Sequence, residues 1–277
     1  MALKQTTRKH ERRIMKTLAV DIGGTGIKAI LLDEKGSPLT ERGRIETPKP
    51  ATPEAITETI IQLAKAQGEF DRVSVGFPGV IRHGYVYTAP NLGNALWKGF
   101  NLVGTLTTRL KKPVRAANDA DVQGFGAING KDIELVITLG TGFGSAMFVD
   151  GKLVPNLELG HHPFRDDETY EEQLGEKTLK KIGKKKWNKR LAKAIEVLDR
   201  VLNFDRLYIG GGNSKKVSLI LPEKVTLVPN TAGLLGGIAF WNLGANDPMN
   251  RRIQAKQTTI SIPKRRSRSI RKKSSQA

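Results

Sequence analysis

Two glycine-rich turns are the segments of this chain whose residue types and spacing best suit phosphate chemistry. The first is Asp21-Ile22-Gly23-Gly24-Thr25-Gly26, between two apolar stretches, and Gly140-Thr141-Gly142-Phe143-Gly144-Ser145 repeats the arrangement in the second half. Glycines let the backbone come close to a phosphate and present N–H groups to it. Thr25 adds a hydroxyl donor, and the Asp21 carboxylate could hold a Mg²⁺ shell or a water.

Neither of two widespread phosphate motifs describes these turns. The first turn lacks the Gly-Lys-Ser/Thr ending of a Walker loop, and a strand follows it where a dinucleotide fingerprint would open a helix. One such turn alone is equally well explained as a tight β-hairpin. The repetition favours a phosphate clamp between two similar domains that face a cleft.

A carboxylate and an amide stand where a short apolar strand is expected to enter a helix, at Asn118-Asp119. Sites in α/β proteins are usually built at the carboxyl ends of strands. Asp119 could accept the proton of an attacking hydroxyl, and Asn118 could hydrogen-bond sugar hydroxyls. Asp121, two residues on, is better explained as a helix cap.

A second polar pair, Glu158 and His161, lies in the segment Glu158-Leu159-Gly160-His161-His162. A carboxylate and an imidazole at this spacing can point into one pocket and bind vicinal hydroxyls. A metal site is disfavoured, because no cysteine or further spaced histidine completes one. The chain has no cysteine, which excludes disulfides, thiolate metal sites and a cysteine nucleophile and is consistent with a reducing cytoplasm.

Basic residues gather near a third run of glycines. Gly210-Gly211-Gly212-Asn213 precedes Lys215 and Lys216, and residues 177–193 hold nine basic side chains and no acidic one. A solvated helix face explains the second group; the alternative is a track for a long polyanion.

Alternating strand and helix patterns should position these groups in an α/β fold. We expect strands at 17–24, 27–33 and up to Ile45, and a helix at 53–67 with proline in its first turn. Further helices are predicted at 101–111 and 186–204, a hairpin turn at Asp150-Gly151, and a closing helix near 231–241.

The uneven distribution of charge along the chain indicates where the folded body begins and ends. The formal net charge is +19, of which residues 1–16 carry +5 and residues 248–277 carry +10. We therefore predict disordered basic tails, either merely solvated or attracting polyanions non-specifically. Between them we expect domains at 17–115 and 116–232, with residues 233–247 packing back on the first. No apolar run approaches the roughly 18 residues of a membrane span, and no signal peptide is recognised.

Taken in order, several motifs resemble those of the ROK sugar kinases over roughly residues 17–240. They are DIGGTGIK, the GFPG turn, AANDAD, LGTGFGSA, ELGHH and the IGGG turn. Within that family the chain is most similar to the polyphosphate glucokinases, through TAPNLGNALWKGFNL, ELGHHPFRDDETYEEQLG, the lysine-rich helix and GGGNSKK.

The resemblance implies the actin-like ATPase (ribonuclease H-like) fold, with two α/β domains and a central cleft. It implies phosphoryl transfer from inorganic polyphosphate to the 6-hydroxyl of glucose, with Asp119 as base, Mg²⁺ as cofactor near Asp21, and ATP open as a second donor. A homodimer working in the cytoplasm, in glycolysis, is expected. The implied glucose contacts are Asn91, Asn118, Asp119, Glu158, His161 and Glu172. The donor contacts are Asp21, Gly23, Gly24, Thr25, Gly26, Lys28, Gly140, Thr141, Gly142, Gly144, Gly211, Gly212, Asn213, Lys215 and Lys216.

Other functions stay open at this point. One is an ATP-dependent glucokinase or glucomannokinase. Another is a ROK-type sugar-responsive DNA-binding regulator, although 16 residues before the first strand are too few for a helix-turn-helix. A non-catalytic sugar sensor is disfavoured, because Asp119 and both glycine turns are present. Many ROK proteins carry a cysteine-rich zinc motif; this chain has none, so zinc is not expected.

Overall fold

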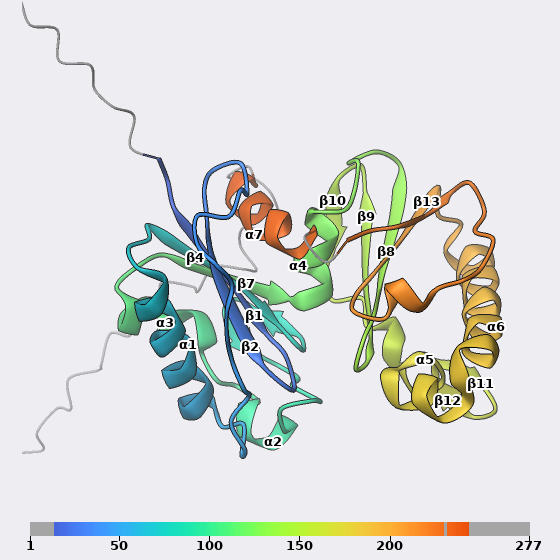
Figure 1. The fold of residues 1–277 in the computed structure, drawn as a ribbon, viewed down its shortest axis with the longest axis horizontal. Helices are drawn as coiled ribbons and strands as arrows, with labels where there is room; N and C mark the ends of the chain where they lie inside the picture. Colours follow the sequence, from blue (N-terminus) through green and yellow to red (C-terminus); the bar gives the residue numbers. More distant parts are fainter. Residues whose placement is uncertain (1–13, 230–231, 244–277) are drawn as a thin grey trace, which may run out of the picture.

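Two five-stranded sheets of the same topology carry the two lobes of the molecule (Figure 1). The computed structural model describes residues 14–229 and 232–243. The first sheet has the order β3 (Gly43–Ile45), β2 (Ile27–Leu32), β1 (Thr17–Ile22), β4 (Arg72–Phe77) and β7 (Val114–Asn118). The second has the order β10 (Lys152–Val154), β9 (Phe143–Val149), β8 (Ile133–Leu139), β13 (Arg206–Gly210) and β14 (Val225–Leu227).

The directions of the strands match as well as their order. In each sheet the middle strand pairs antiparallel with the strand after its glycine turn, β1 with β2 and β8 with β9. On its other side it pairs parallel, β1 with β4 and β8 with β13. The repeat in the sequence therefore corresponds to a duplicated fold unit, with each glycine turn at the same corner of its sheet.

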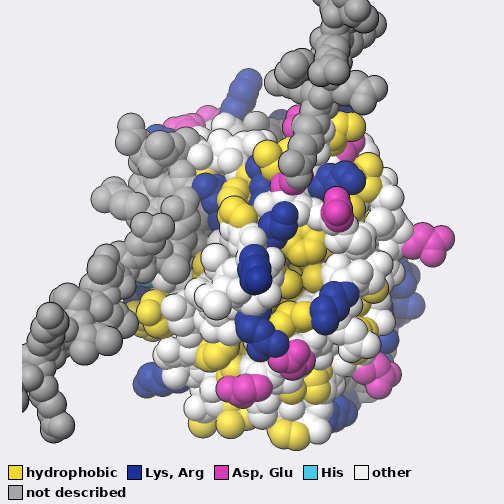
Figure 2. Space-filling view, turned by 90° about the vertical axis from the view of Figure 1, so that its left-hand side faces the viewer, with side chains coloured by type: hydrophobic (Ala, Val, Ile, Leu, Met, Phe, Trp, Pro, Cys, Tyr) yellow, Lys and Arg dark blue, Asp and Glu magenta, His cyan; other side chains and the backbone are white. Residues whose placement is uncertain are grey.

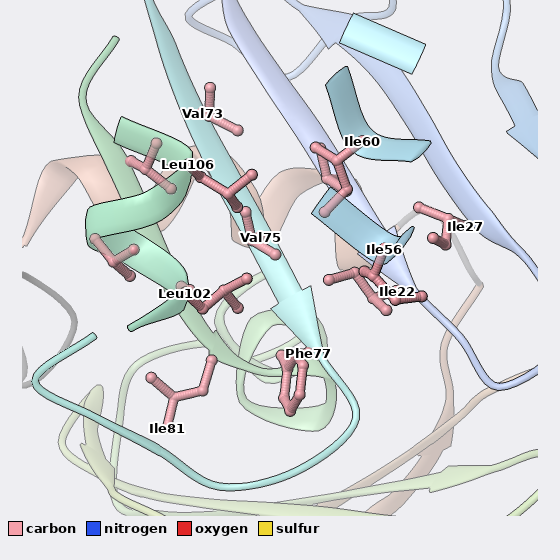
Figure 3. Close-up of a cluster of buried hydrophobic side chains, with 14 of the residues drawn as sticks. Ile22, Ile27, Ile56, Ile60, Val73, Val75, Phe77, Ile81, Leu102 and Leu106 are labelled. Atoms are coloured by element: carbon pink, nitrogen blue, oxygen red, sulfur yellow. The ribbon is translucent and has the colours of Figure 1, made fainter. Parts of the chain in front are cut away.

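Helices α1 (Pro53–Gln67) and α3 (Leu102–Leu110) cover one face of the first sheet (Figure 1). Thr52 caps α1 by accepting a hydrogen bond from Ala55 N at 3.2 Å, so the helix begins and ends where the sequence predicts. Ile56 and Ile60 of α1 and Leu102 and Leu106 of α3 share one apolar core with β4 and the β1–β2 hairpin (Figure 3). The strands contribute Val73, Val75, Phe77, Ile22 and Ile27.

The opposite face of the first sheet meets α7 (Ala232–Asn242), the predicted closing helix. Ile238 of α7 packs with Ala19, Ile30 and Leu32. Helix α4 (Asp119–Phe125) follows β7 directly and lies against α7 between the lobes (Figure 1). Residues 244–247 of the expected closing segment lie outside the described residues.

The second lobe buries its sheet under α5 (Tyr170–Leu174) and α6 (Glu176–Leu202). Trp187, Leu191, Ala194 and Leu198 line the buried side of α6. The helix predicted at 186–204 is longer than expected: it starts at Glu176 and bends at Gly183, whose φ of 77° is in the left-handed region.

Short elements complete the chain. They are β5 (Ile81–Arg82), β6 (Tyr85–Val86), α2 (Asn94–Trp97), β11 (Pro163–Arg165), β12 (Glu168–Thr169) and the 3₁₀ turns Leu159–His161 and Ser214–Lys216. The predicted turn at Asp150-Gly151 joins β9 to β10 with both residues at positive φ. No helix in residues 14–229 or 232–243 is both long and apolar enough to span a bilayer.

The lobe boundary lies a few residues later than 115/116. Strand β7 pairs in register with β4 as far as Asn118, so the first sheet includes residues assigned by sequence to the second domain. At the amino end, Met15 N donates to Glu34 Oε1 at 3.1 Å and Lys16 N to Asp71 Oδ2 at 2.9 Å, so the body begins before residue 17. The rest of both predicted tails lies outside the described residues.

On the outer side of the first lobe, Figure 2 shows basic side chains interspersed with acidic and apolar ones.

Candidate active site

A cavity of about 380 Å³ lies between the lobes and is lined from both of them. The first lobe contributes Asp21, the Gly23–Gly26 turn, Lys28 and Asn91, and the second contributes Gly140–Gly144, Glu158 and His161. Asn118 and Asp119, at the junction of β7 and α4, and Gly211 and Gly212, after β13, also line it. The structure thus brings both glycine turns and the predicted base into one site.

The first turn is a closed hairpin fixed by its neighbours. Gly23 N donates to Gly26 O at 3.1 Å, and Thr47 Oγ1 donates to Gly23 O at 2.6 Å. Asp21 and Lys28 are opposite each other in the β1–β2 register, and Lys28 Nζ lies 2.9 Å from Asp21 Oδ2. An anion in this turn would therefore meet an ammonium group already held in place.

The second turn is fixed in a comparable way. Gly140 N donates to Gly142 O at 3.1 Å, while Gly140 O accepts from Glu176 N at 2.9 Å and from Asn213 Nδ2 at 3.1 Å. These bonds tie the turn to the start of α6 and to the glycines that follow β13. The pair of turns is geometrically suited to hold a phosphate from two sides.

Asn118 and Asp119 start α4, and the helix orients both. Asn118 is the N-cap: its Oδ1 accepts from Ala120 N at 2.8 Å, and its Nδ2 donates to Gly79 O and Glu158 Oε1 at 3.3 Å each. Burial, together with the charges of Asp21 and Glu158, raises the pKa of Asp119 to about 7, although the hydrogen bond from Ala120 N opposes the shift. A carboxylate with this pKa is suited to accept a proton near neutral pH.

Glu158 and His161 line the cavity from the second lobe. His161 Nε2 is 3.8 Å from Glu158 Oε2, and burial raises the pKa of Glu158 while the His161 charge opposes the shift. Ser145 holds their loop, because its Oγ donates to Leu157 O at 2.6 Å and accepts from Leu159 N at 3.0 Å. The pair presents an acceptor and an imidazole to the cavity, as binding of neighbouring hydroxyls requires.

The structure places Glu172 elsewhere than the resemblance implies. Glu172 closes a capping box at the start of α5: its Oε2 accepts from Thr169 N at 2.8 Å, and Thr169 Oγ1 accepts from Glu172 N at 3.2 Å. Glu171 lines the cavity in its stead, and its Oε2 accepts from Phe143 N at 3.1 Å. Gly142 leaves the room that the Glu171 carboxylate takes up. The Thr-x-x-Glu pattern in the sequence already indicated that Glu172 would cap the helix.

Exchanging each glutamate for glutamine separates these two roles. Glu171→Gln is expected to lower kcat/KM by about tenfold or more, because one of its carboxylate oxygens is fixed on the second turn and the side chain borders the cavity. Glu172→Gln should leave kcat/KM unchanged and lower the Tm only slightly, through the weakened capping box. Steady-state kinetics and thermal unfolding of both variants check this. A large kinetic loss in Glu172→Gln alone would restore the original assignment.

Three predicted donor contacts do not line the cavity. Asn213 instead holds Gly140 O, and the Lys215 and Lys216 side chains are exposed on the turn that follows. Besides Glu171, the cavity residues absent from the sequence prediction include Arg42 and Gln123. They reach the site only through the pairing of distant strands and the position of α4.

Asp121 does not cap α4, contrary to the sequence interpretation, since Asn118 occupies that position. Its side chain is 2% exposed, and its Oδ1 has no hydrogen-bond partner among the described residues. Burial and the charges of Glu158 and Asp119 raise its pKa well above the usual range. Burial therefore favours the protonated form of Asp121.

Comparison with known proteins relates this chain to one family. The ROK family model matches residues 17–175. The polyphosphate glucokinase of Mycobacterium tuberculosis is 33% identical over 248 residues, covering 83% of this chain and 91% of that protein.

Solved structures agree with the sequence comparison. The inorganic polyphosphate/ATP-glucomannokinase of Arthrobacter sp. strain KM superposes with a TM-score of 0.74 at 34% identity, covering 81% of this chain and 97% of that one. A ROK family glucokinase of Streptomyces griseus, in complex with glucose and AMPPNP, shares the fold with a TM-score of 0.66 at 21% identity, covering 80% and 98%. The duplicated sheets, the cavity between them and these matches lead to one conclusion: the chain belongs to the ROK family and has the actin-like ATPase fold.

Proposed function

We propose that this protein transfers a phosphoryl group from inorganic polyphosphate to the 6-hydroxyl of glucose, giving glucose 6-phosphate. The observation that carries the proposal is one cavity holding two phosphate-type turns and Asp119, whose pKa is about 7, beside polar groups for a sugar. The similarity to polyphosphate glucokinases over most of both chains supports polyphosphate as donor.

The residues divide the work between sugar and donor. Asn118, Glu158, His161 and Glu171, with Asn91, would bind the sugar and orient its hydroxyl towards the terminal phosphorus; all of them line the cavity. The hydroxyl oxygen bonds to that phosphorus while the bond to the bridging oxygen breaks, and the proton passes to Asp119. The products are glucose 6-phosphate and a polyphosphate shorter by one unit.

The fixed N–H groups of the two turns stabilise charge on the transferred group. They are already oriented by hydrogen bonds within the protein, so no reorganisation is needed when charge develops. Lys28, held by Asp21, adds a positive charge beside the first turn. Positioning and charge neutralisation therefore supply most of the catalysis.

Mg²⁺ fits this site as a partner of the donor. Among the described residues no cluster of three or more metal-binding side chains forms a protein cage. Mg²⁺ commonly uses one or two carboxylates together with substrate phosphates, and the carboxylate of Asp21 borders the cavity. Asp21 would hold the ion, which would neutralise phosphate charge, while Asp119 stays free to accept the proton. The homodimer and the cytoplasmic, glycolytic setting stay predictions.

A coupled assay for glucose 6-phosphate tests the proposal. Polyphosphate and ATP are supplied in parallel, since the similar Arthrobacter enzyme is named for both donors. Turnover with polyphosphate supports the proposed function, and turnover with ATP alone would favour an ATP-dependent glucokinase. Absence of product with either donor would contradict a kinase function.

The lysines of α6 test whether the second lobe helps to bind polyphosphate. Asn188 Nδ2 donates to Lys216 O at 3.1 Å, so α6 packs on the turn that carries Lys215 and Lys216. Replacing the exposed Lys184, Lys185 and Lys186 by glutamine should raise the polyphosphate KM several-fold at low salt and leave the glucose KM unchanged.

A matched control removes the same charge elsewhere. Replacing the exposed Lys35, Lys65 and Lys131 by glutamine should leave both KM values unchanged. Equal effects of the two triple variants would show that only net charge matters, and no effect of either would exclude the α6 lysines from donor binding.

A further inference from the structure

A row of charged side chains crosses the first sheet from the cavity to its edge. Asp21 of β1 is opposite Lys28 of β2, and Lys28 is opposite Arg44 of β3. Neighbouring strands lie roughly 4.8 Å apart, so these side chains form one continuous row on one face. Arg42 is two residues before Arg44 and lines the cavity, as does Lys28.

The row lies on the part of this face that α7 does not cover. Ala19 and Ile30, on the same face at the other end of β1 and β2, pack with Ile238 of α7. Towards the glycine turn this face borders the cavity, where Asp21 and Lys28 are found. Charged groups here are therefore available to a ligand that enters the cavity.

Arg44 is held against the phosphate turn itself. Its Nη2 donates to Thr25 O at 3.0 Å. A Cβ on Gly26 would come within 2.7 Å of Arg44 Nε, so the absence of a side chain at residue 26 provides the space for the guanidinium. The arginine thereby adds positive charge directly at the turn.

The charge of the row is not cancelled by nearby acids. Lys28 is paired with Asp21, but in the part of the chain that the structure describes no carboxylate forms an ion pair with Arg42 or Arg44. In contrast, none of the described lysines of residues 177–193, nor Lys215 or Lys216, lines the cavity. The lysine and arginine side chains that line the cavity, Lys28 and Arg42, therefore both belong to the first lobe.

We propose that Lys28, Arg44 and Arg42 form a binding track for the inorganic polyphosphate chain behind its transferred unit. This inference rests on the proposed function and adds a site to it. The terminal phosphate occupies the two turns, and the following phosphates bind at Lys28 and at the two arginines beside the edge of the first sheet. A donor of three phosphates reaches the turns but engages the arginines less than a long chain does.

Binding of fluorescently labelled long-chain polyphosphate, measured without glucose over a range of salt, tests the track. The double variant Arg42→Gln/Arg44→Gln is expected to weaken binding about tenfold or more at low salt. The slope of log affinity against log salt should fall by about 0.7 for each charge removed, the value known for single-stranded nucleic acid. The KM for tripolyphosphate should rise by a smaller factor than the KM for long-chain polyphosphate, and the KM for glucose should change less than twofold.

Three further variants make the test specific. Arg44→Lys should restore most of the salt slope, and Gly26→Ala should act like Arg44→Gln because it displaces the guanidinium. Arg109→Gln, on α3 against the other face of the sheet, should bind polyphosphate like the wild type.

The two proposals can fail separately. Wild-type affinity and salt slope in the double variant would overturn the track, as would an equal loss in Arg109→Gln or no binding by the wild type. Failure of the wild type to form glucose 6-phosphate would overturn the proposed function, whatever the binding data show.

Discussion

Asp119→Asn is expected to lower kcat by about 10²- to 10⁴-fold while glucose still binds. The asparagine keeps the size of the side chain and its place at the start of α4 but cannot accept the hydroxyl proton. Initial rates with polyphosphate, together with glucose affinity from calorimetry, measure the two effects separately. Near-normal turnover in Asp119→Asn would remove this residue from the role of base.

Asp121→Asn provides the matched control on the same helix. Its burial raises the pKa of the carboxyl and so favours the protonated form, which asparagine resembles in size and charge. We expect its kcat to stay within a few-fold of the wild type. A loss as large as that of Asp119→Asn would show that the helix as a whole, and not the proton acceptor, is sensitive to these substitutions.

The pH dependence of the wild type checks the same assignment. The base must be ionised, so kcat/KM should rise with pH through a limb at about 7, the pKa of Asp119. Because the Asp21 charge raises this pKa, Asp21→Asn should move the limb to lower pH, whatever it does to the maximal rate. If the limb of Asp21→Asn stays at the same pH as in the wild type, the limb reports the ionisation of a group other than Asp119.

The sequence predicts best where a local signal decides the structure. Helix α1 starts and ends as expected, because Thr52 and Pro53 define its start and Gly68 its end. The two glycine turns were recognised for the same reason, since each lies between adjacent strands. Glu172 is an exception. The family resemblance implies a sugar contact for it, whereas the local Thr169-x-x-Glu172 pattern predicts the capping box that the structure has.

Features that depend on distant parts of the chain were missed. Arg44 reaches the first turn through the β2–β3 pairing, and Gln123 reaches the cavity because α4 lies between the lobes. The start of α6 was missed because Gly183 interrupts the helical pattern and exposed lysines surround it. The extent of β7 was misjudged because its pairing with β4, not its composition, decides where the sheet ends.

Helices α4 and α7 approach each other so closely that only glycine fits at two points of contact. A Cβ on Gly236 of α7 would overlap Val122 O, and a Cβ on Gly126, which ends α4, would overlap Ala232 O. Both obstacles are backbone atoms, which cannot turn aside as the end of a side chain can. The position of α4, and with it that of Asp119, therefore depends on these two glycines.

Gly236→Ala is expected to destabilise the protein by about 3 kcal/mol or more, since the helices must separate to admit the methyl group. For a chain of this size that corresponds to a fall in Tm of roughly 10 °C, with loss of activity as α4 shifts. Gly233→Ala makes the same exchange on the same helix, where no described atom would lie within 4 Å of the new Cβ. That variant should gain up to about 1 kcal/mol from the better helix former. Thermal unfolding of both variants measures the difference in Tm between them. Equal Tm values would mean that the close contact between α4 and α7 does not hold the lobes together.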